Sequence, residues 1–430
     1  MNPFHPAGLA LTVTLLLSGC GSGDGRSADR TLHTVIDSTG DTIVARTEGD
    51  VAPGRRHTLQ AEVTIAPAAD DTSLFTEVYD FEVDRAGRFW VFDRPSSTVF
   101  LFSPEGQLLR RIGRRGAGPG EFRGSNGMVA LPDSGVAILD ASNARVSFLD
   151  AAGDFRTSWR VPSGFSTGNG LVADRSRRLY LRRPVTGPRE GEILGRMGLV
   201  LMNEQGELAD SLIPPDLDVP RELYVAVQVT KGGQSQSATG ARYAPGYYWA
   251  WHPDGYFVVA NGGTGEIILA RPAGQPLVIR RSFSPVPVND TERDEEAAMI
   301  TWQMRRTDPA WTWNGPDLPR SKAPLLWLTV TRDGRIWTRV AVPSERIPDA
   351  EVATPVNDEQ PVSHYRNPEI FEVYEPDGRF LGRIDCHCRI SLVDAEGDTV
   401  WGIVRDENDL PAIVRFRVEP GLEEKGRSEK

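Results

Sequence analysis

The sequence predicts an all-β protein: a six-bladed β-propeller with four-stranded antiparallel blades and one helical insertion. A turn rich in Asp and Gly, followed by a short alternating apolar strand, recurs six times, at 84–92, 132–139, 174–181, 253–259, 332–337 and 395–401. Most copies are followed by a second hairpin, at 102–109, 149–155, 202–208 and 374–381. Two hairpins make a four-stranded sheet, and six sheets stacked radially bury apolar faces that one sheet alone leaves exposed.

Composition agrees with one repetitive, turn-rich architecture. The chain has 430 residues, of which 39% are hydrophobic and 25% charged, with 43 glycines and 32 prolines. The formal net charge is −11 and the basic residues are scattered along the chain. A nucleic-acid binder needs a basic patch, so we expect no nucleic-acid partner.

The N-terminus carries an export signal. Residues 9–17 are almost continuously apolar, too short to span a bilayer, and run into Leu17-Ser-Gly-Cys20. This resembles a bacterial lipoprotein signal, which implies a signal peptide over 1–19, lipid (palmitate) attachment at Cys20 and a flexible tether over 20–30. Because no Lys or Arg precedes the apolar run, an ordinary secretory signal is the alternative. Gly at position 21 is not the inner-membrane retention aspartate, which favours an outer-membrane lipoprotein facing the periplasm or the cell surface.

The propeller is expected to occupy residues 31–420, followed by a disordered tail over 421–430. The first strand pair, 34–36 and 42–45, has no repeat partner of its own. We therefore expect it to complete the last blade beside 412–418 and to close the ring.

The loop GRRGAGPGEF, residues 113–122, superficially resembles a phosphate-binding loop. It opens no predicted helix, lacks Lys-Ser or Lys-Thr, and joins two strands of neighbouring blades. Its glycines are better explained by positive φ angles where the chain crosses between blades.

Two segments carry a family resemblance. Gly116-Ala-Gly-Pro-Gly-Glu-Phe122, followed by Asp140-Ala-Ser-Asn-Ala-Arg-Val-Ser-Phe148, resembles the loop and strand signature of NHL-repeat propellers. The wider pattern is similar to bacterial six-bladed β-propeller lipoproteins. The match is close over 80–160, loose in the other blades and absent from the insertions. It implies the fold and leaves the activity open.

Two insertions interrupt the repeat. The first, about 183–246, contains the Gly, Ser and Gln-rich piece 231–237, which predicts a loop. The second, about 286–326, predicts a helix capped at Asn289 or Asp290, with acidic residues near its start and Arg305 and Arg306 near its end. We expect its apolar face to lie on the propeller and to cover one end of the central channel; that face comprises Ala297, Ile300 and Met304.

Tryptophans gather in the second insertion, at positions 302, 311, 313 and 327. If exposed, Trp302, Trp311 and Trp313 would bind a ligand by stacking on sugar rings or by anchoring a protein. The alternative is that they pack the insertion onto the blades. Three other tryptophans recur at one strand position and are predicted core residues: Trp90, Trp337 and Trp401.

No catalytic residue stands out from the sequence. The six histidines have no metal-ligand spacing, and no nucleophile-elbow motif occurs. Alternation on a strand would put Cys386 and Cys388 on one face and His387 on the other, so a shared metal ion is disfavoured and a strained disulfide stays open. Carboxylates facing the axis leave open a calcium ion in the central channel as the one candidate cofactor.

These observations favour a lipid-anchored, exported propeller that acts as a monomeric binding or scaffold module for an envelope protein or glycan. Its contact with the membrane would run through the lipid anchor only. The alternative is a metal-dependent hydrolase or lyase with its site in the central channel.

Overall fold

The computed structural model describes residues 33–49, 51, 53–67, 74–161, 170–187, 195–203, 205–220, 223–230, 233–352, 354–355, 357, 359–386, 388–406 and 410–422. The predicted signal peptide, the tether and Cys20 lie outside these residues, as does the predicted tail beyond residue 422. Within the described part of the chain, no helix is long and apolar enough to cross a membrane.

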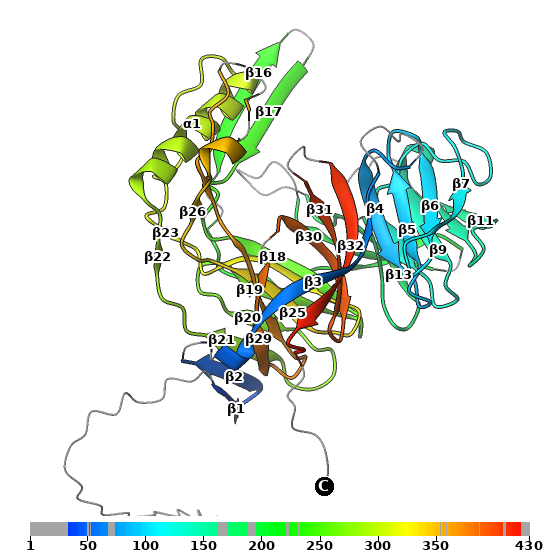
Figure 1. Ribbon diagram of the computed structural model, residues 1–430, viewed down its shortest axis with the longest axis horizontal. Coiled ribbons are helices and arrows are strands. Elements are labelled where there is room, and N and C mark those ends of the chain that lie inside the picture. Colours follow the sequence, from blue (N-terminus) through cyan, green and yellow to red (C-terminus); the bar gives the residue numbers. More distant parts are fainter. Residues whose placement is uncertain are drawn as a thin grey trace, which may run out of the picture.

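Six blades of four antiparallel strands confirm the predicted six-bladed β-propeller (Figure 1). The first three blades use consecutive strands: β4 (Val78–Val83), β5 (Phe89–Asp93), β6 (Thr98–Phe102) and β7 (Leu108–Ile112) in blade I; β8 (Met128–Ala130), β9 (Val136–Asp140), β10 (Arg145–Leu149) and β11 (Phe155–Arg160) in blade II; β12 (Leu171–Ala173), β13 (Leu179–Pro184), β14 (Met197–Met202) and β15 (Leu208–Leu212) in blade III.

Of the other three blades, blade VI takes its fourth strand from the N-terminal part of the chain. They comprise β18 (Tyr247–His252), β19 (Tyr256–Asn261), β20 (Ile267–Leu269) and β21 (Leu277–Arg281) in blade IV; β24 (Leu325–Val330), β25 (Ile336–Val340), β28 (Glu369–Tyr374) and β29 (Phe380–Cys386) in blade V; β30 (Ile390–Glu396), β31 (Thr399–Arg405), β32 (Pro411–Glu419) and the N-terminal β3 (Arg56–Ile65) in blade VI. All six predicted Asp and Gly-rich turns join the first and second strands of a blade.

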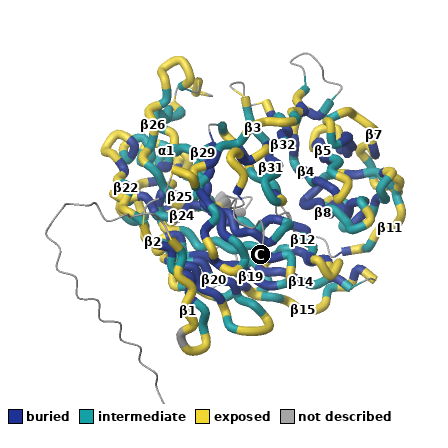
Figure 2. Tube along the Cα trace, turned by 60° about the horizontal axis from the view of Figure 1, so that its bottom comes forward, coloured by how far each residue is buried: buried dark blue, intermediate teal, exposed yellow. Residues whose placement is uncertain are grey.

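The hydrophobic core lies between the blades. Each of six buried clusters draws its residues from two neighbouring blades, and the six clusters occupy all six interfaces of the ring. The three predicted core tryptophans are buried in or beside them, at positions 90, 337 and 401. Figure 2 shows this buried material following the strands, with exposed residues concentrated in the loops.

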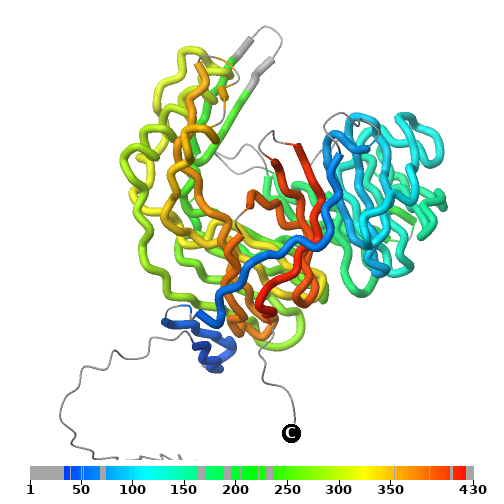
Figure 3. The backbone as a smooth tube through the Cα atoms, in the orientation of Figure 1, coloured from blue at the N-terminus to red at the C-terminus, as the bar shows by residue number. Residues whose placement is uncertain are grey.

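The strand that closes the ring differs from the predicted one. β3 pairs antiparallel with β32, from Thr58 opposite Glu419 to Ile65 opposite Ile413, and Figure 3 shows this N-terminal segment beside the C-terminal strands. The predicted pair forms the hairpin of β1 (His33–Thr39) and β2 (Thr42–Glu48), and β2 instead lies parallel to β21 of blade IV. The prediction was wrong because β3, which is longer and also alternates apolar residues, takes the place beside β32.

Three insertions lie at the end of the propeller opposite the Asp and Gly-rich turns, because each follows the second or fourth strand of a blade. We call them together the arm: residues 213–246, 282–324 and 341–368. Their elements are β16 (Tyr224–Thr230), β17 (Gly233–Thr239), β22 (Val286–Pro287), α1 (Asp290–Thr307), β23 (Ser321–Lys322), β26 (Glu345–Arg346), the short 3-10 helix Asp349–Glu351 and β27 (Tyr365–Arg366). Two further 3-10 turns, Pro53–Arg55 and Ala141–Asn143, lie outside the arm.

The arm corrects several expectations. β14 and β15 of blade III fall inside the predicted 183–246 insertion, and 233–237 belong to β17 rather than to a loop. The helix begins as predicted, since Asn289 caps it and forms a capping box with Glu292. Its buried residues Ile300 and Met304 contact the β16–β17 hairpin rather than the blades, so α1 packs within the arm instead of on the propeller.

Candidate functional site

The turn end of the propeller is tied together by charged side chains. Arg332 of blade V donates hydrogen bonds to the carbonyl oxygen of Val83 in blade I (2.7 Å) and to Asp394 in blade VI. Arg175 of blade III donates to Asp254 of blade IV and to the carbonyl oxygen of Arg332 (2.9 Å). Five of the six blades are therefore linked at this end by two guanidinium groups.

Two carboxyl groups of the inner strand β4 lie beside this network. Burial, together with the negative charges of Asp394 and Asp80, raises the pKa of Glu82 to about 8, while the positive charge of Arg332 opposes this shift. Burial also raises the pKa of Asp80 to about 6, against the Ser125 hydroxyl that hydrogen-bonds to it. Glu82 is therefore largely protonated at neutral pH. Among the described residues, no group of three or more His, Cys, Asp or Glu side chains is arranged to hold a metal ion.

The glycine-rich loop serves as a connection between blades I and II. Arg145 donates hydrogen bonds to the carbonyl oxygens of Ala117 (3.0 Å), Gly118 (2.8 Å) and Glu121 (2.6 Å), and Asn143 donates to that of Gly116 (2.9 Å). The amide of Gly118 in turn donates to the Glu121 carboxylate at 2.9 Å. A phosphate-binding loop presents free amide groups to its ligand. In this loop the carbonyl oxygens instead accept hydrogen bonds from the Arg145 guanidinium. The loop therefore has a structural role.

A buried lysine joins the insertions that form the arm. The Lys322 side chain is fully buried, and its Nζ donates to the carbonyl oxygen of Val342 (2.9 Å), Ser344 Oγ (2.5 Å) and Asn367 Oδ1 (2.9 Å). Glu292 of α1 lies 3.9 Å from Nζ and supplies the opposite charge. Burial lowers the pKa of Lys322 to about 8, although Glu292 favours the charged form.

The first insertion reaches the same centre through Tyr243. Its ring centroid lies 4.5 Å from the Lys322 Nζ, and its hydroxyl donates to Glu292 at 3.3 Å. Glu295, one turn further along α1, accepts a backbone hydrogen bond from His364 (3.0 Å) and lies 2.8 Å from the His364 ring nitrogen. All three insertions are therefore held in one arrangement, which fixes the outward face of α1.

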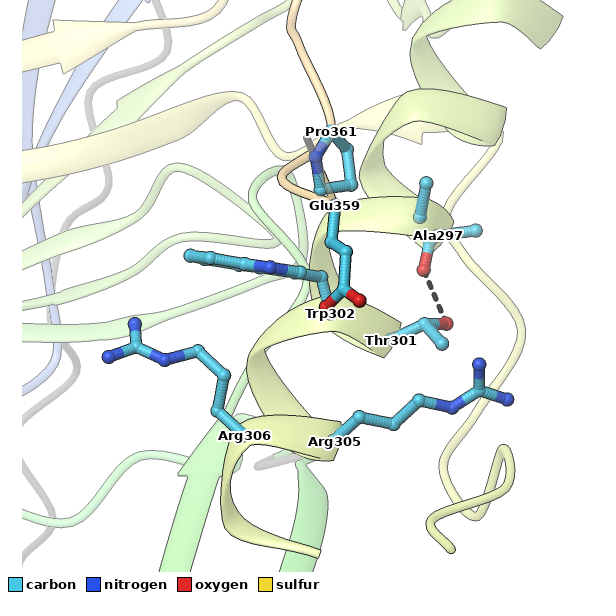
Figure 4. Close-up of a pocket in the computed structure, with 8 residues that line it drawn as sticks. Ala297, Thr301, Trp302, Arg305, Arg306, Glu359 and Pro361 are labelled. Carbon is cyan, nitrogen blue, oxygen red and sulfur yellow. Dashed lines mark hydrogen bonds between the residues drawn. The ribbon is translucent and has the colours of Figure 1, made fainter. Parts of the chain in front are cut away.

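That outward face forms a pocket of about 740 Å³ with the third insertion. Its lining comprises Ala297, Ala298, Thr301, Trp302, Arg305, Arg306, Glu359 and Pro361. Figure 4 shows Glu359 reaching from its loop toward Trp302 and Thr301, while Arg305 and Arg306 extend to opposite sides of the helix. The pocket therefore combines one aromatic ring with two cations and one carboxylate.

The two arginines of the pocket have no acidic partner in the described part of the chain. The Arg306 guanidinium lies 5.0 Å from the centroid of the Trp302 ring, and Arg305 Nε makes a long hydrogen bond of 3.4 Å to the carbonyl oxygen of Trp311. Many other arginines of this protein are paired, as Arg332 is with Asp394. Trp302, Arg305 and Arg306 therefore present an aromatic and cationic surface that is available to an anionic ligand.

The candidate tryptophans separate in the structure. Trp302 lines the pocket, whereas Trp311 is buried with Ile300 and Met304 and donates its indole N–H to the carbonyl oxygen of Val225 at 2.9 Å. Trp313 is 38% exposed and packs on Tyr224, with ring centroids 4.5 Å apart, outside the pocket. Trp327 belongs to blade V, where it packs beside Phe371.

Sequence reasoning missed the other pocket residues. The sequence indicates Arg305 and Arg306 only as charges that stabilise a helix C-terminus, and it gives no reason to single out Glu359. The signal for the two arginines is their spacing of three and four residues from Trp302, since residues so spaced are neighbours on a helix surface. Nothing in the sequence indicates that residues 359–361 lie against α1.

Comparison with known proteins supports the fold. A family model described as a 6-bladed β-propeller matches residues 67–164, close to the stretch 80–160 that carried the sequence resemblance. No curated protein matches the chain.

Similar solved structures include a Bacteroides fragilis protein described as exported (11% identity, 88% of this chain and 99% of that chain, TM-score 0.46). They also include virginiamycin B lyase from Staphylococcus aureus (9%, 84% and 99%, 0.41) and a gluconolactonase from Xanthomonas campestris (12%, 84% and 99%, 0.38). The blade topology and the family model together make the chain a six-bladed β-propeller that carries an inserted arm at one end.

Proposed function

We propose that this protein is an exported, lipid-anchored binding module, and that its arm binds an acidic glycan of the cell envelope in the pocket beside α1. The propeller acts as a rigid base that holds the arm. The lipid on Cys20 would keep the module at the membrane.

The observation that carries the proposal is the Trp302 ring with Arg306 beside it and Arg305 on the other side of the helix. Neither arginine has an acidic partner among the described residues. Tryptophan offers a flat apolar face with a polar edge, which suits the C–H face of a sugar ring. Guanidinium groups bind carboxylates through two parallel hydrogen bonds. An aromatic ring beside one guanidinium group, with a second guanidinium group across the helix, therefore favours a sugar chain that bears carboxylates.

The remaining lining agrees with this ligand class. The Glu359 carboxylate and the Thr301 hydroxyl can bind sugar hydroxyls, although Thr301 already donates to the carbonyl oxygen of Ala297 at 2.7 Å. Because Arg305 and Arg306 extend to opposite sides, an oligosaccharide lying across the helix would meet both, whereas a single ring would meet one. A volume of about 740 Å³ accommodates a small ligand of this kind.

Export and anchoring are supported by the sequence alone. Residues 9–17 supply the apolar segment, and Leu17-Ser-Gly-Cys20 supplies the acylation motif. The first described strand begins at His33, so the chain between Cys20 and β1 would link the lipid to the propeller.

The test is binding of oligogalacturonate to the full chain, monitored by isothermal titration calorimetry. We expect Trp302→Ala to weaken binding at least about tenfold, since loss of a central aromatic contact commonly costs more than 1 kcal/mol. Trp313→Ala is the matched control, because Trp313 is an exposed tryptophan of the arm that lies outside the pocket. The affinity of this variant for oligogalacturonate should equal that of the wild-type chain. A neutral oligosaccharide of the same length should bind more weakly.

Equal loss of binding in both variants, or no oligogalacturonate binding by the wild-type chain, would refute the glycan assignment. In that case crosslinking in cells would test for a protein partner. A protein partner would give one dominant crosslinked envelope protein, and the Trp302→Ala substitution would abolish that crosslink.

A further inference from the structure

Two cysteines meet where the chain passes from blade V to blade VI. Cys386 ends β29, and Cys388 lies two residues further along, just before β30. Their sulfur atoms are 2.8 Å apart. A disulfide bond is about 2.05 Å long, so a small movement would join them.

The two thiols differ in their surroundings. Cys386 is buried among the apolar residues of blades V and VI, whereas Cys388 is only partly buried at the edge of that cluster. Glu369 lies opposite Cys386 in the β28–β29 pair, and both of its carboxylate oxygens accept hydrogen bonds from Arg339 (2.9 and 3.1 Å). Cys388 is therefore the sulfur that an external molecule can reach.

The hydrogen bond between the thiols has opposite effects on them. It stabilises a thiolate at Cys388 and lowers the pKa of that thiol, while it raises the pKa of Cys386, which burial raises further. The accessible sulfur is thus also the better source of a thiolate, and thiolates are the attacking species in disulfide exchange.

We propose that Cys386 and Cys388 form a thiol–disulfide exchange site whose substrate is an external disulfide. The Cys388 thiolate attacks one sulfur of that disulfide, forming a mixed disulfide and releasing the first substrate thiol. The Cys386 sulfur, after losing its proton to solvent, attacks the Cys388 sulfur and releases the second substrate thiol. Overall the protein dithiol loses two electrons and two protons, and the substrate disulfide gains them.

The position of the pair fits exchange better than structural crosslinking. A bond between residues two apart closes a very short loop, which removes little entropy from the unfolded chain. Short, partly exposed disulfides belong to the reducible class. Cys20, the only other cysteine of the chain, is the predicted lipid attachment site and takes no part.

The test uses the full chain with Cys20→Ser, so that only two thiols remain, treated with oxidised glutathione and then alkylated. We expect intact mass spectrometry to show two alkylated thiols before treatment and none afterwards, with no added glutathione. Added to this background, Cys386→Ser should trap a stable adduct of one glutathione at Cys388. Cys388→Ser should form its adduct more slowly, because Cys386 is buried.

Two outcomes would overturn the proposal: persistence of both free thiols in the folded wild-type pair, or adduct formation at equal rates in the two single variants. Circular dichroism of each variant verifies that the fold is retained. Because oligogalacturonate binding involves neither cysteine, that assay separates failure of this proposal from failure of the proposed function.

Discussion

The two ends of this propeller are built in different ways. At the turn end, short Asp and Gly-rich turns bring Arg175 and Arg332 onto acidic groups and carbonyl oxygens of other blades. At the other end, three long insertions form the arm, whose outward face leaves Arg305 and Arg306 without acidic partners in the described chain. Arg175 and Arg332 link the blades through their partners, whereas the guanidinium groups of Arg305 and Arg306 have no acidic partner among the described residues.

From this contrast we expect substitutions at the turn end to lower the stability of the fold and substitutions in the pocket to weaken ligand binding. Arg332 and Asp394 at the turn end are mostly buried and compensate one another, so removing one partner leaves the charge of the other uncompensated. No acidic side chain among the described residues is paired with the exposed arginines of the pocket. Replacing these arginines should therefore leave the stability of the fold unchanged.

The largest expected effect is at Arg332. Arg332→Ala leaves Asp394 without its ion pair and removes the hydrogen bond to the Val83 carbonyl oxygen, so the free energy of unfolding should fall by about 3 kcal/mol. Urea denaturation followed by tryptophan fluorescence measures this. The control is Arg346→Ala, an exposed arm arginine paired with Asp349, which should cost at most about 0.5 kcal/mol. Similar losses in both variants would contradict the contrast between the ends.

A smaller effect concerns pH. The pKa of Glu82 is about 8 in the folded protein against an ordinary 4.5, so the folded state holds this proton more tightly than the unfolded state. Its contribution to stability is complete below about pH 4.5 and is lost as the pH rises through about 8. Between pH 6.5 and 8 the free energy of unfolding should fall by about 2 kcal/mol, measured by urea denaturation at each pH.

Glu82→Gln should remove most of this pH dependence of the free energy of unfolding, because the amide does not titrate. Asp80, Asp394 and Arg332 face the same carboxyl group, and all three are retained in this variant. A slope unchanged by the substitution would show that another group is responsible.

The smallest effect is confined to the arm. Asn289→Ala removes the side chain that accepts the Glu292 amide hydrogen bond at 2.9 Å, and loss of such a cap costs about 1 kcal/mol of helix stability. Amide hydrogen exchange should accelerate within 290–307 and stay unchanged in β5 and β9 of the blades. Acceleration throughout the molecule would mean that the arm and the propeller unfold as one unit.

Much of the fold was predictable because the propeller repeats a local signal. Each Asp and Gly-rich turn with its alternating strand is encoded within about ten residues, so six copies give the blade number. Ring closure was not predictable in this way, because 34–45 and 56–65 both contain strands, and only pairing with β32 distinguishes them.

The site was predicted only in part for the same reason. Trp302 could be singled out by its local context, and the cap at Asn289 by its spacing from Glu292. The arm, by contrast, is assembled from 213–246, 282–324 and 341–368 around Lys322. Contacts between such distant segments, including the approach of Glu359 to α1, leave no periodic pattern in the sequence.

The most direct test of the contrast between the two ends is hydrogen exchange of the full chain with and without oligogalacturonate. We expect slower exchange in 297–306 and 359–361, with no change in the turns at 84–88, 252–256 and 331–335. Slower exchange at those turns, with none along α1, would contradict the assignment of ligand binding to the arm.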